Sequence, residues 1–358
     1  MGIQAVVMPK WGLSMTTGTV TEWLVEEGDE ISKGQDLVEI DTDKIVGTLE
    51  ADFSGVLRRI VTGPGEQAPV GGTIAVVAGS DVSDGDIDAA VEKARADNAS
   101  GAVEEASGPE IATVTVDGRA LSYAKLGDGD DVLVLVHGYG GDKNSWLFVQ
   151  EPLSSRFTTY ALDLPGHGAS AKDVGDGSLD LLSSALLGFL AAMDISSAHL
   201  VGHSLGGAVA VRAAASPVVS GLTLVAPAGI GPDINADYLR GFASASTRRE
   251  LKPHLAALFA DEKLVNRQLA DDLLKYKRLD GVSAALDALL RTLSDGIDVS
   301  GELAALTKPV SVVWGVEDRV VPIGNAAALP ESVTLRRIDG AGHMVHMENP
   351  AAVRDAIP

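Results

Sequence analysis

Residues 1–79 contain an internal repeat, and this repeat limits the possible folds of the chain more than any other feature. Residues of the first half recur in the second half at an offset of 37: Gly18 and Gly55, Gly28 and Gly65, Gly34 and Gly71, Leu37 and Ile74, Ile40 and Val77. Between the turn glycines lie alternating, β-branched runs such as residues 18–25, a pattern typical of half-buried strands. Because neither half can bury its apolar face alone, the repeat predicts a small, flattened β-sandwich with a quasi-twofold axis.

A single lysine, Lys44, lies between the two halves, in the segment Asp41-Thr42-Asp43-Lys44-Ile45. The residues before it predict a tight turn, which places Lys44 at the tip of a hairpin. A lysine displayed on a rigid turn is suited to covalent modification. The alternative is an ordinary solvated surface lysine.

The sequence around this lysine resembles that of lipoyl domains, and the resemblance covers residues 1–79. It rests on Met8-Pro9-Lys10-Trp11-Gly12, Glu26-Glu27-Gly28-Asp29, Lys33-Gly34-Gln35 and Asp41-Thr42-Asp43-Lys44. The resemblance implies that Lys44 carries lipoic acid in amide linkage, as N6-lipoyllysine. A biotin carrier normally has methionine on both sides of its lysine, whereas Asp43 and Ile45 stand here, so the resemblance favours a lipoyl group.

Composition and charge exclude several classes of function. The 358 residues allow two or three domains, and 46% hydrophobic residues allow a sizeable core. The formal net charge of -22 argues against binding to nucleic acid or to an anionic membrane, since both require a basic surface. The chain has no cysteine, which rules out disulfides and thiolate metal sites, and we expect no metal site. With no leader and no membrane-spanning run in view, we expect a cytoplasmic protein.

Residues 80–110 predict a flexible acidic linker. This short segment carries a net charge of -7 and contains no aromatic residue. Residues 86–96 show weak helical spacing through Ile87, Val91 and Ala94. As a coil the linker would span roughly 30 Å root-mean-square and on the order of 100 Å when fully extended. That range would let the first domain move between distant sites, whereas the alternative is a passive spacer.

From residue 111 onward strands and helices alternate, which predicts an open, mostly parallel α/β sheet. The run Val132–Val136 is apolar throughout, as in a strand that is buried on both faces. Other strands are predicted at residues 112–116, 120–124, 158–162, 198–201, 222–225, 310–314 and 333–338. Residues 228–308 separate two of these strands and look largely helical, with segments at 237–245, 254–259, 264–277 and 282–293.

Three polar side chains follow the predicted strands at their carboxyl ends. Ser204 lies in Gly202-His203-Ser204-Leu205-Gly206, a Gly-x-Ser-x-Gly elbow whose glycines allow a strained turn that presents the hydroxyl. Asp318 follows a buried strand, and His343 follows the last predicted strand. The order Ser, Asp, His along the chain is the order expected for a nucleophile elbow on an α/β sheet. Since parallel strands end at one sheet edge, we expect Ser204 as nucleophile, His343 as base and Asp318 as the residue that orients the base.

The segment His137-Gly138-Tyr139-Gly140-Gly141 follows the first long buried strand. The backbone N–H groups of Tyr139 and Leu205 are placed to form an oxyanion hole. The other polar residues of this region are interpreted as structural: His203 in elbow packing, His137 and Asp163 in loop hydrogen bonds, His346 and Glu348 as anchors of the final loop, and His254 at the surface.

Together these motifs resemble the α/β-hydrolase family over residues 111–358. Further matches are Asp163-Leu164-Pro165-Gly166-His167-Gly168 and Asp318-Arg319-Val320-Val321-Pro322. In that family an insertion such as residues 228–308 forms a cap over the site. The resemblance therefore implies an acyl-transfer site at Ser204 beneath a helical cap.

A lipoyl-like domain followed by an α/β-hydrolase-like domain resembles the acyltransferase components of acetoin dehydrogenase complexes. The resemblance implies two partners, a thiamine-diphosphate-dependent enzyme that acetylates lipoyl-Lys44 and a flavin dihydrolipoamide dehydrogenase that reoxidises it, with coenzyme A as acetyl acceptor. The chain departs from the ordinary acyltransferases of 2-oxo-acid dehydrogenases, whose His-x-x-x-Asp-Gly motif would need histidine at Leu335 before Asp339-Gly340. No peripheral-subunit-binding domain is recognisable in the linker.

Two other functions fit the same residues. Ser204 would hand acyl groups to water in a serine hydrolase or thioesterase, with the first domain as a tether. Alternatively, the second domain would be a non-catalytic scaffold and the chain a lipoyl carrier. Product analysis with and without coenzyme A separates these functions.

Overall fold

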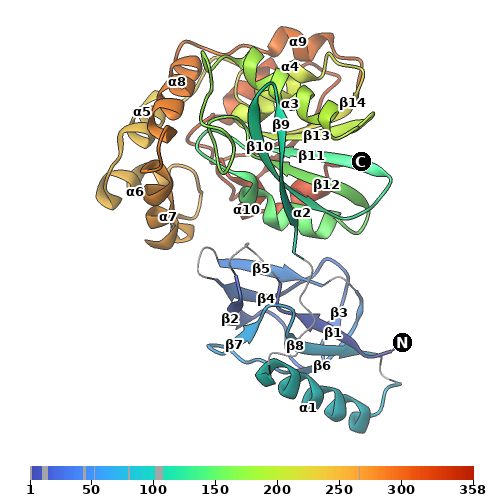
Figure 1. The fold of residues 1–358 in the computed structure, drawn as a ribbon. Helices are drawn as coiled ribbons and strands as arrows, with labels where there is room; N and C mark the ends of the chain where they lie inside the picture. Colours follow the sequence, from blue (N-terminus) through green and yellow to red (C-terminus); the bar gives the residue numbers. More distant parts are fainter. Residues whose placement is uncertain are drawn as a thin grey trace. The chain divides into compact units, whose positions relative to one another are not determined.

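The computed structural model describes residues 2–9, 15–42, 46–51, 53–79, 81–100, 108–265 and 267–358. The chain divides into two compact units, Met1–Gly108 and Pro109–Pro358, which we call the N-terminal unit and the C-terminal unit (Figure 1).

The N-terminal unit contains two four-stranded sheets, with the orders β1-β8-β6-β3 and β5-β4-β2-β7. The strands are β1 (Gln4–Val7), β2 (Thr17–Trp23), β3 (Glu30–Ile31), β4 (Asp36–Asp41), β5 (Val46–Glu50), β6 (Gly55–Ile60), β7 (Gln67–Pro69) and β8 (Thr73–Ala78). Each sheet combines strands from both halves of the repeat, since β3 pairs with β6 and β2 pairs with β7. This exchange confirms the predicted flattened β-sandwich.

Reciprocal hydrogen bonds demonstrate the quasi-twofold relation of the two halves. The Gly28 N–H donates to the Leu57 carbonyl, and the Gly65 N–H donates to the Val20 carbonyl, both at 2.7 Å. Each of these pairs repeats the other at the offset of 37 that the sequence shows. Gly28 and Gly65 have φ values of 101° and 82°, a left-handed backbone that favours glycine.

Strands β4 and β5 form the hairpin that contains Lys44. Their antiparallel register ends at the pair Asp41 and Val46. Lys44 itself, with its two neighbours, lies outside the described residues.

The stretch predicted as a flexible linker is partly folded, which corrects that prediction. Residues Asp84–Ser100 form α1, and its buried residues Ile87, Val91 and Ala94 pack on the β6–β8 sheet. An ion pair of 2.7 Å between Arg58 and Asp84 adds to this contact. The weak helical spacing of Ile87, Val91 and Ala94 is sufficient to form a helix because these side chains pack against an apolar face of the sheet. Residues 101–107 of the predicted linker lie outside the described residues.

The C-terminal unit is built on an eight-stranded sheet of order β16-β15-β14-β13-β11-β12-β10-β9. Its strands are β9 (Glu110–Val116), β10 (Arg119–Leu126), β11 (Asp131–Val136), β12 (Phe157–Leu162), β13 (Ala198–His203), β14 (Val219–Val225), β15 (Val310–Gly315) and β16 (Thr334–Ile338). The pairs β9–β10 and β10–β12 are antiparallel, and the others are parallel. The predicted α/β sheet is therefore confirmed.

Helices cover both faces of this sheet. Val134 and Val136 of β11 lie in a core with α3 (Leu179–Ala192) and α4 (Leu205–Ala213). Leu133 and Leu135 lie in a second core on the opposite face, with α2 (Leu147–Leu153), α10 (Val345–Glu348) and α11 (Pro350–Arg354). Residues 132–136 of β11 are all apolar because the strand faces both cores.

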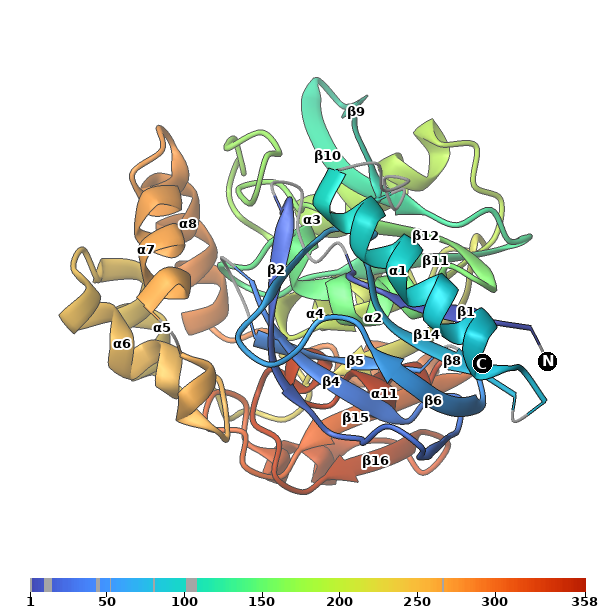
Figure 2. The ribbon, with the colours of Figure 1, turned by 90° about the horizontal axis from the view of Figure 1, so that it is seen from below.

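The insertion between β14 and β15 is helical, as predicted. It contains α5 (Ala236–Ser244), α6 (Arg248–Ala256), η2 (Glu262–Leu264), α7 (Arg267–Lys277), α8 (Val282–Ser294) and α9 (Ser300–Ala305). Figure 1 and Figure 2 both show α5, α6, α7 and α8 as a group beside the sheet. The helix predicted at residues 254–259 is wrong in its bounds. A capping box between Thr247 and Glu250 starts α6 earlier, and the chain leaves the helix after Ala256.

Candidate active site

Three predicted residues lie at the carboxyl edge of the C-terminal sheet. Ser204 follows β13, Asp318 follows β15 and His343 lies in the loop after β16. All three are buried, with exposed fractions of 6%, 6% and 3%. Because the three strands run parallel, their ends bring segments far apart in sequence to one edge.

The turn at Ser204 is strained in the way the elbow motif predicts. Ser204 has φ 51° and ψ -118°, a conformation that costs free energy for a residue with a side chain. The glycines allow it, since a Cβ at Gly202 would lie 2.5 Å from the Gly206 carbonyl oxygen, and one at Gly206 would lie 2.3 Å from that of Val136. The Ser204 N–H donates to Val225, which fastens the turn to β14. The turn therefore holds Ser204 at the start of α4.

Asp318 and His343 form a buried hydrogen bond. Nδ1 of His343 lies 2.8 Å from Oδ2 of Asp318. The other carboxylate oxygen accepts from the N–H groups of Val320 and Val321, at 2.8 and 2.9 Å. A carboxylate bound in this way accepts the Nδ1 proton, so Nε2 of a neutral His343 carries none. His343 then has a nitrogen that is free to act as a base.

The His343 loop is anchored by the carbonyl of Leu258, which lies far away in the sequence, and by the nearby side chain of Glu348. The His343 N–H donates to the carbonyl of Leu258, which follows α6, at 2.8 Å. Glu348 accepts from the N–H groups of Gly342 and Ala260, at 2.7 and 2.6 Å. Burial raises the pKa of Glu348, against the effect of these donors. Glu348 thus anchors the final loop, as predicted, whereas the contribution of Leu258 had no signal in the sequence, because a backbone carbonyl makes the contact.

His203 and His346 pack beneath the loop that carries His343. Nε2 of His203 lies 3.0 Å from the carbonyl oxygen of His343 and therefore donates to it. The ring centroids of His203 and His346 are 4.5 Å apart, and the His346 ring also stacks on Trp146 at 4.6 Å. Burial lowers the pKa of His203 well below its ordinary value and that of His346 to about 3. Both imidazoles are therefore neutral packing groups.

The two predicted oxyanion residues border Ser204 from different elements. Leu205 is the first residue of α4. Tyr139 lies in the loop after β11, and a Cβ at its neighbour Gly138 would be 2.9 Å from Cβ of Ser204. The loop after β11 therefore passes directly beside Ser204.

Hydrogen bonds from three side chains connect the loops at the sheet edge to the helical insertion. The Tyr139 hydroxyl donates to the Leu286 carbonyl of α8 at 3.1 Å, and the Tyr276 hydroxyl of α7 donates to Gly166 at 2.9 Å. Arg319, next to Asp318, donates to the carbonyls of Ala256 and Phe259 at 2.5 and 2.6 Å. These hydrogen bonds hold the insertion against the loops that carry the predicted site residues. Sequence reasoning missed Tyr276 and assigned no role to Arg319.

Comparison with known proteins identifies both units. Residues 133–356 match the model of the Alpha/beta hydrolase family, and residues 4–77 match the model described as Biotin-requiring enzyme. Among solved structures, a bacterial membrane phospholipase A is similar at 26% identity, with a TM-score of 0.61 over 69% of this chain and 84% of that one. A meta-cleavage product hydrolase from Pseudomonas fluorescens, at 22% identity and a TM-score of 0.62 over 68% and 94%, shares the fold. Within the part of the chain that the structure describes, no helix has the length and apolar character to cross a membrane.

Two curated relatives match this chain across both units. One is the dihydrolipoyllysine-residue acetyltransferase component of the acetoin cleaving system of Pseudomonas putida, 47% identical over 352 residues, which cover 97% of this chain and 95% of the relative. Another is the component of the same name from Cupriavidus necator, 44% identical over 351 residues, 96% and 93% of the two chains. The chain therefore belongs to the α/β-hydrolase family and, over nearly its whole length, to the family of the dihydrolipoyllysine-residue acetyltransferase components of acetoin cleaving systems.

Proposed function

We propose that the C-terminal unit transfers an acetyl group from a thioester on dihydrolipoyl-Lys44 to coenzyme A, with Ser204, His343 and Asp318 as its catalytic residues. The observation that carries this proposal is the buried Asp318–His343 hydrogen bond at the sheet edge that bears the Ser204 elbow. The chain that holds this site also holds a domain of the biotin and lipoyl type.

In the proposed first half-reaction, Oγ of Ser204 attacks the thioester carbonyl carbon while Nε2 of His343 takes the hydroxyl proton. The carbon–sulfur bond breaks, His343 returns the proton to the leaving thiol, and the acetyl group remains on Ser204. In the second half-reaction, His343 takes the proton of the coenzyme A thiol, whose sulfur attacks the acetyl ester, and Oγ of Ser204 recovers a proton. The N–H groups of Tyr139 and Leu205 stabilise the oxyanion in both.

The exclusion of water is the main requirement for such a transfer. Donor and product are both thioesters, so the exchange is close to thermoneutral, whereas hydrolysis is strongly downhill and wastes the acetyl group. The insertion at residues 228–308 is the element available to cover the site. Its contacts through Tyr139, Tyr276 and Arg319 hold it to the loops around Ser204.

Lipoic acid in amide linkage to Lys44 supplies the carrier thiol in this proposal. Lys44 lies in the segment between β4 and β5, whose pairing ends at Asp41 and the exposed Val46, and a lysine beside such a strand end is open to a modifying enzyme and to several active sites. The chain would receive acetyl groups from a thiamine-diphosphate-dependent enzyme and be reoxidised by a flavin dihydrolipoamide dehydrogenase, in a multienzyme complex like those named for its relatives.

Hydrolysis is the second candidate function, because the solved structures that resemble the C-terminal unit include several hydrolases. The deciding assay supplies S-acetyl-dihydrolipoamide to the full chain and follows acetate and acetyl-coenzyme A together. We expect acetyl-coenzyme A as the main product. Acetate formed at the same rate with and without coenzyme A would refute the transferase and favour the hydrolase. Transfer that survives Ser204→Ala unchanged would show direct attack by the thiol, without acetyl-Ser204.

A further inference from the structure

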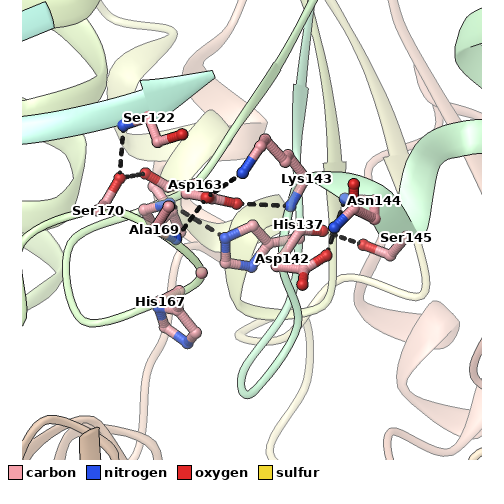
Figure 3. A network of polar contacts seen from close by, with 12 residues as sticks. Ser122, His137, Asp142, Lys143, Asn144, Ser145, Asp163, His167, Ala169 and Ser170 are labelled. Carbon is pink, nitrogen blue, oxygen red and sulfur yellow. Dashed lines mark hydrogen bonds and ion pairs between the residues drawn. The ribbon is translucent and has the colours of Figure 1, made fainter. Parts of the chain in front are cut away.

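Two loops at the sheet edge are joined by a pair of buried imidazoles that the proposed function does not use (Figure 3). His137 begins the loop after β11, and His167 lies in the loop after β12. Both side chains are fully buried, and their ring centroids lie 4.7 Å apart in an edge-to-face arrangement.

Hydrogen bonds define the protonation state of His137. The Leu164 N–H donates to Nε2 at 3.0 Å, so this nitrogen carries no proton. Nδ1 lies 2.8 Å from the carbonyl oxygen of Gly138, which only accepts, so Nδ1 carries the proton. His137 is therefore the neutral Nδ1–H tautomer.

His167 repeats this arrangement from the opposite loop. The Gly140 N–H donates to its Nε2 at 3.1 Å, and its Nδ1 lies 3.1 Å from the carbonyl oxygen of Pro165. Each imidazole thus accepts from a backbone N–H of the other loop and donates to a carbonyl of its own. The two rings form a reciprocal clasp that requires both of them to be neutral.

The clasp determines how the peptide between Gly138 and Tyr139 is turned. The Gly138 carbonyl accepts from Nδ1 of His137 and from the Gly141 N–H at 3.1 Å. In a trans peptide the N–H points opposite to the carbonyl, so the Tyr139 N–H is directed away from His137. Gly138 borders Ser204 closely enough that a Cβ there would come within 2.9 Å of the Ser204 Cβ.

We infer that His137 and His167 are positioning residues, which hold the peptide between Gly138 and Tyr139 so that the Tyr139 N–H faces the acyl oxygen at Ser204. This inference rests on the proposed function, because it requires an oxyanion to form at Ser204. Neither imidazole exchanges a proton with substrate, and each acts only through the backbone of the loop.

Charged groups lie around the clasp, but both imidazoles stay neutral. Asp163 faces His137 but forms a buried ion pair of 2.8 Å with Lys143 and accepts from the N–H groups of Lys143 and Ala169 (Figure 3). Asp142 also faces His137, and Lys172 faces His167. Burial lowers the pKa of both histidines, and for His137 it outweighs the opposite effect of Asp163 and Asp142.

Kinetics of the full chain with S-acetyl-dihydrolipoamide and coenzyme A test the inference. We expect His167→Ala to lower kcat about 10²-fold, as loss of one oxyanion donor does, with KM unchanged, because ground-state contacts remain. His167→Gln, whose amide oxygen replaces Nε2 as the acceptor for the Gly140 N–H, should recover most of kcat. His199→Gln is the matched control, since His199 is a buried imidazole on β13 that bonds to Thr223. Equal kcat losses in His167→Ala and His199→Gln, or a rise in KM alone, would overturn the inference.

Nitrogen NMR of the histidine side chains tests the clasp independently of activity and of the stability of the variants. Long-range proton–nitrogen spectra of the 15N-labelled full chain should show His137 and His167 as neutral Nδ1–H tautomers at pH 7.5 and still at about pH 6.5, where an ordinary histidine is half protonated. An Nε2–H tautomer, or half protonation of either ring at that pH, would overturn the inference. Full turnover in Ser204→Ala would refute the covalent route of the proposed function, and the spectra would then decide the clasp by themselves.

Discussion

The residues that we propose to be functional differ in exposure between the two units of this chain. In the N-terminal unit, the paired strands on either side of Lys44 end at Asp41 and Val46, and Val46 has 40% of its surface accessible. In the C-terminal unit, Ser204, Asp318 and His343 are buried beyond the carboxyl ends of β13, β15 and β16, which run parallel in one sheet. A carrier residue must reach several sites, whereas a catalytic relay requires fixed distances and little water.

The distribution of histidine separates the units further. All seven histidines of the chain belong to the C-terminal unit. Burial lowers the pKa of five of them, His137, His167, His199, His203 and His346. The same burial that fixes the candidate site therefore makes its unit sensitive to acid, and the N-terminal unit has no histidine to share this sensitivity.

The largest expected effect is the complete loss of the lipoyl group in Lys44→Arg, because arginine keeps the charge but has no amine for the amide. Intact mass of protein from a lipoylating host should lack the lipoyl increment. Lys33→Arg, in a loop of the same unit, should keep it. A lipoyl increment that persists in Lys44→Arg would contradict the assignment of the carrier residue.

The second effect concerns the buried site, where we expect Ser204→Ala and His343→Ala each to lower kcat on the order of 10⁴-fold or more. The double variant should be about as slow as either single variant, because the residues act as one relay. Ser183→Ala, a buried serine on α3 that donates to Asp180, should leave kcat unchanged. Independent, multiplicative losses would contradict the relay.

Acid should destabilise the C-terminal unit more than the N-terminal unit. An unfolded histidine gains a proton near pH 6.5, whereas folded His346 gains one only at about pH 3. Between these values the unfolded state binds more protons, so the free energy of unfolding falls as the pH falls, by about 1.4 kcal/mol per pH unit for each such histidine.

The variant His346→Phe measures how much His346 contributes to the loss of stability in acid. Phenylalanine keeps a ring beside Trp146, and the nitrogens it removes are buried without hydrogen-bond partners among the described residues. Calorimetry of the full chain at pH 7.5 and 5.0 should show a smaller shift of the C-terminal transition in the variant than in the wild type. An unchanged shift would show that His346 titrates normally in the folded unit.

The last expected effect is confined to the N-terminal unit. Ile87→Ala leaves a cavity under α1 and should lower the stability of that unit by about 2–4 kcal/mol. Turnover of free S-acetyl-dihydrolipoamide by the C-terminal unit should stay the same. Asp88→Asn, which removes the solvent-exposed ion pair with Arg59, is the control and should change stability very little. An Ile87→Ala chain as stable as Asp88→Asn would contradict the packing of α1.

Sequence patterns predicted the strands of the C-terminal sheet better than the helices of the insertion. Apolar runs such as residues 132–136 define a buried strand on their own, because both faces need apolar side chains. The helix predicted at residues 254–259 failed because Leu255, Leu258 and Phe259 look like a helical face. In the structure the chain leaves the helix there, and the Leu258 carbonyl binds the His343 loop. Leu258 and His343 are 85 residues apart in the sequence, so their contact produces no local sequence pattern.

The sequence by itself determined the two-part organisation, the repeat of the β-sandwich and the order of the elbow, acid and histidine motifs, because periodicity and turn chemistry are local properties. Only the tertiary structure decided that α1 belongs to the N-terminal unit, that the Leu258 carbonyl anchors the His343 loop, and that His137 and His167 clasp two loops. Each of these depends on burial and on hydrogen bonds to backbone groups far away in the sequence. Backbone groups are the same at every position, so their partners become visible only when the chain is folded.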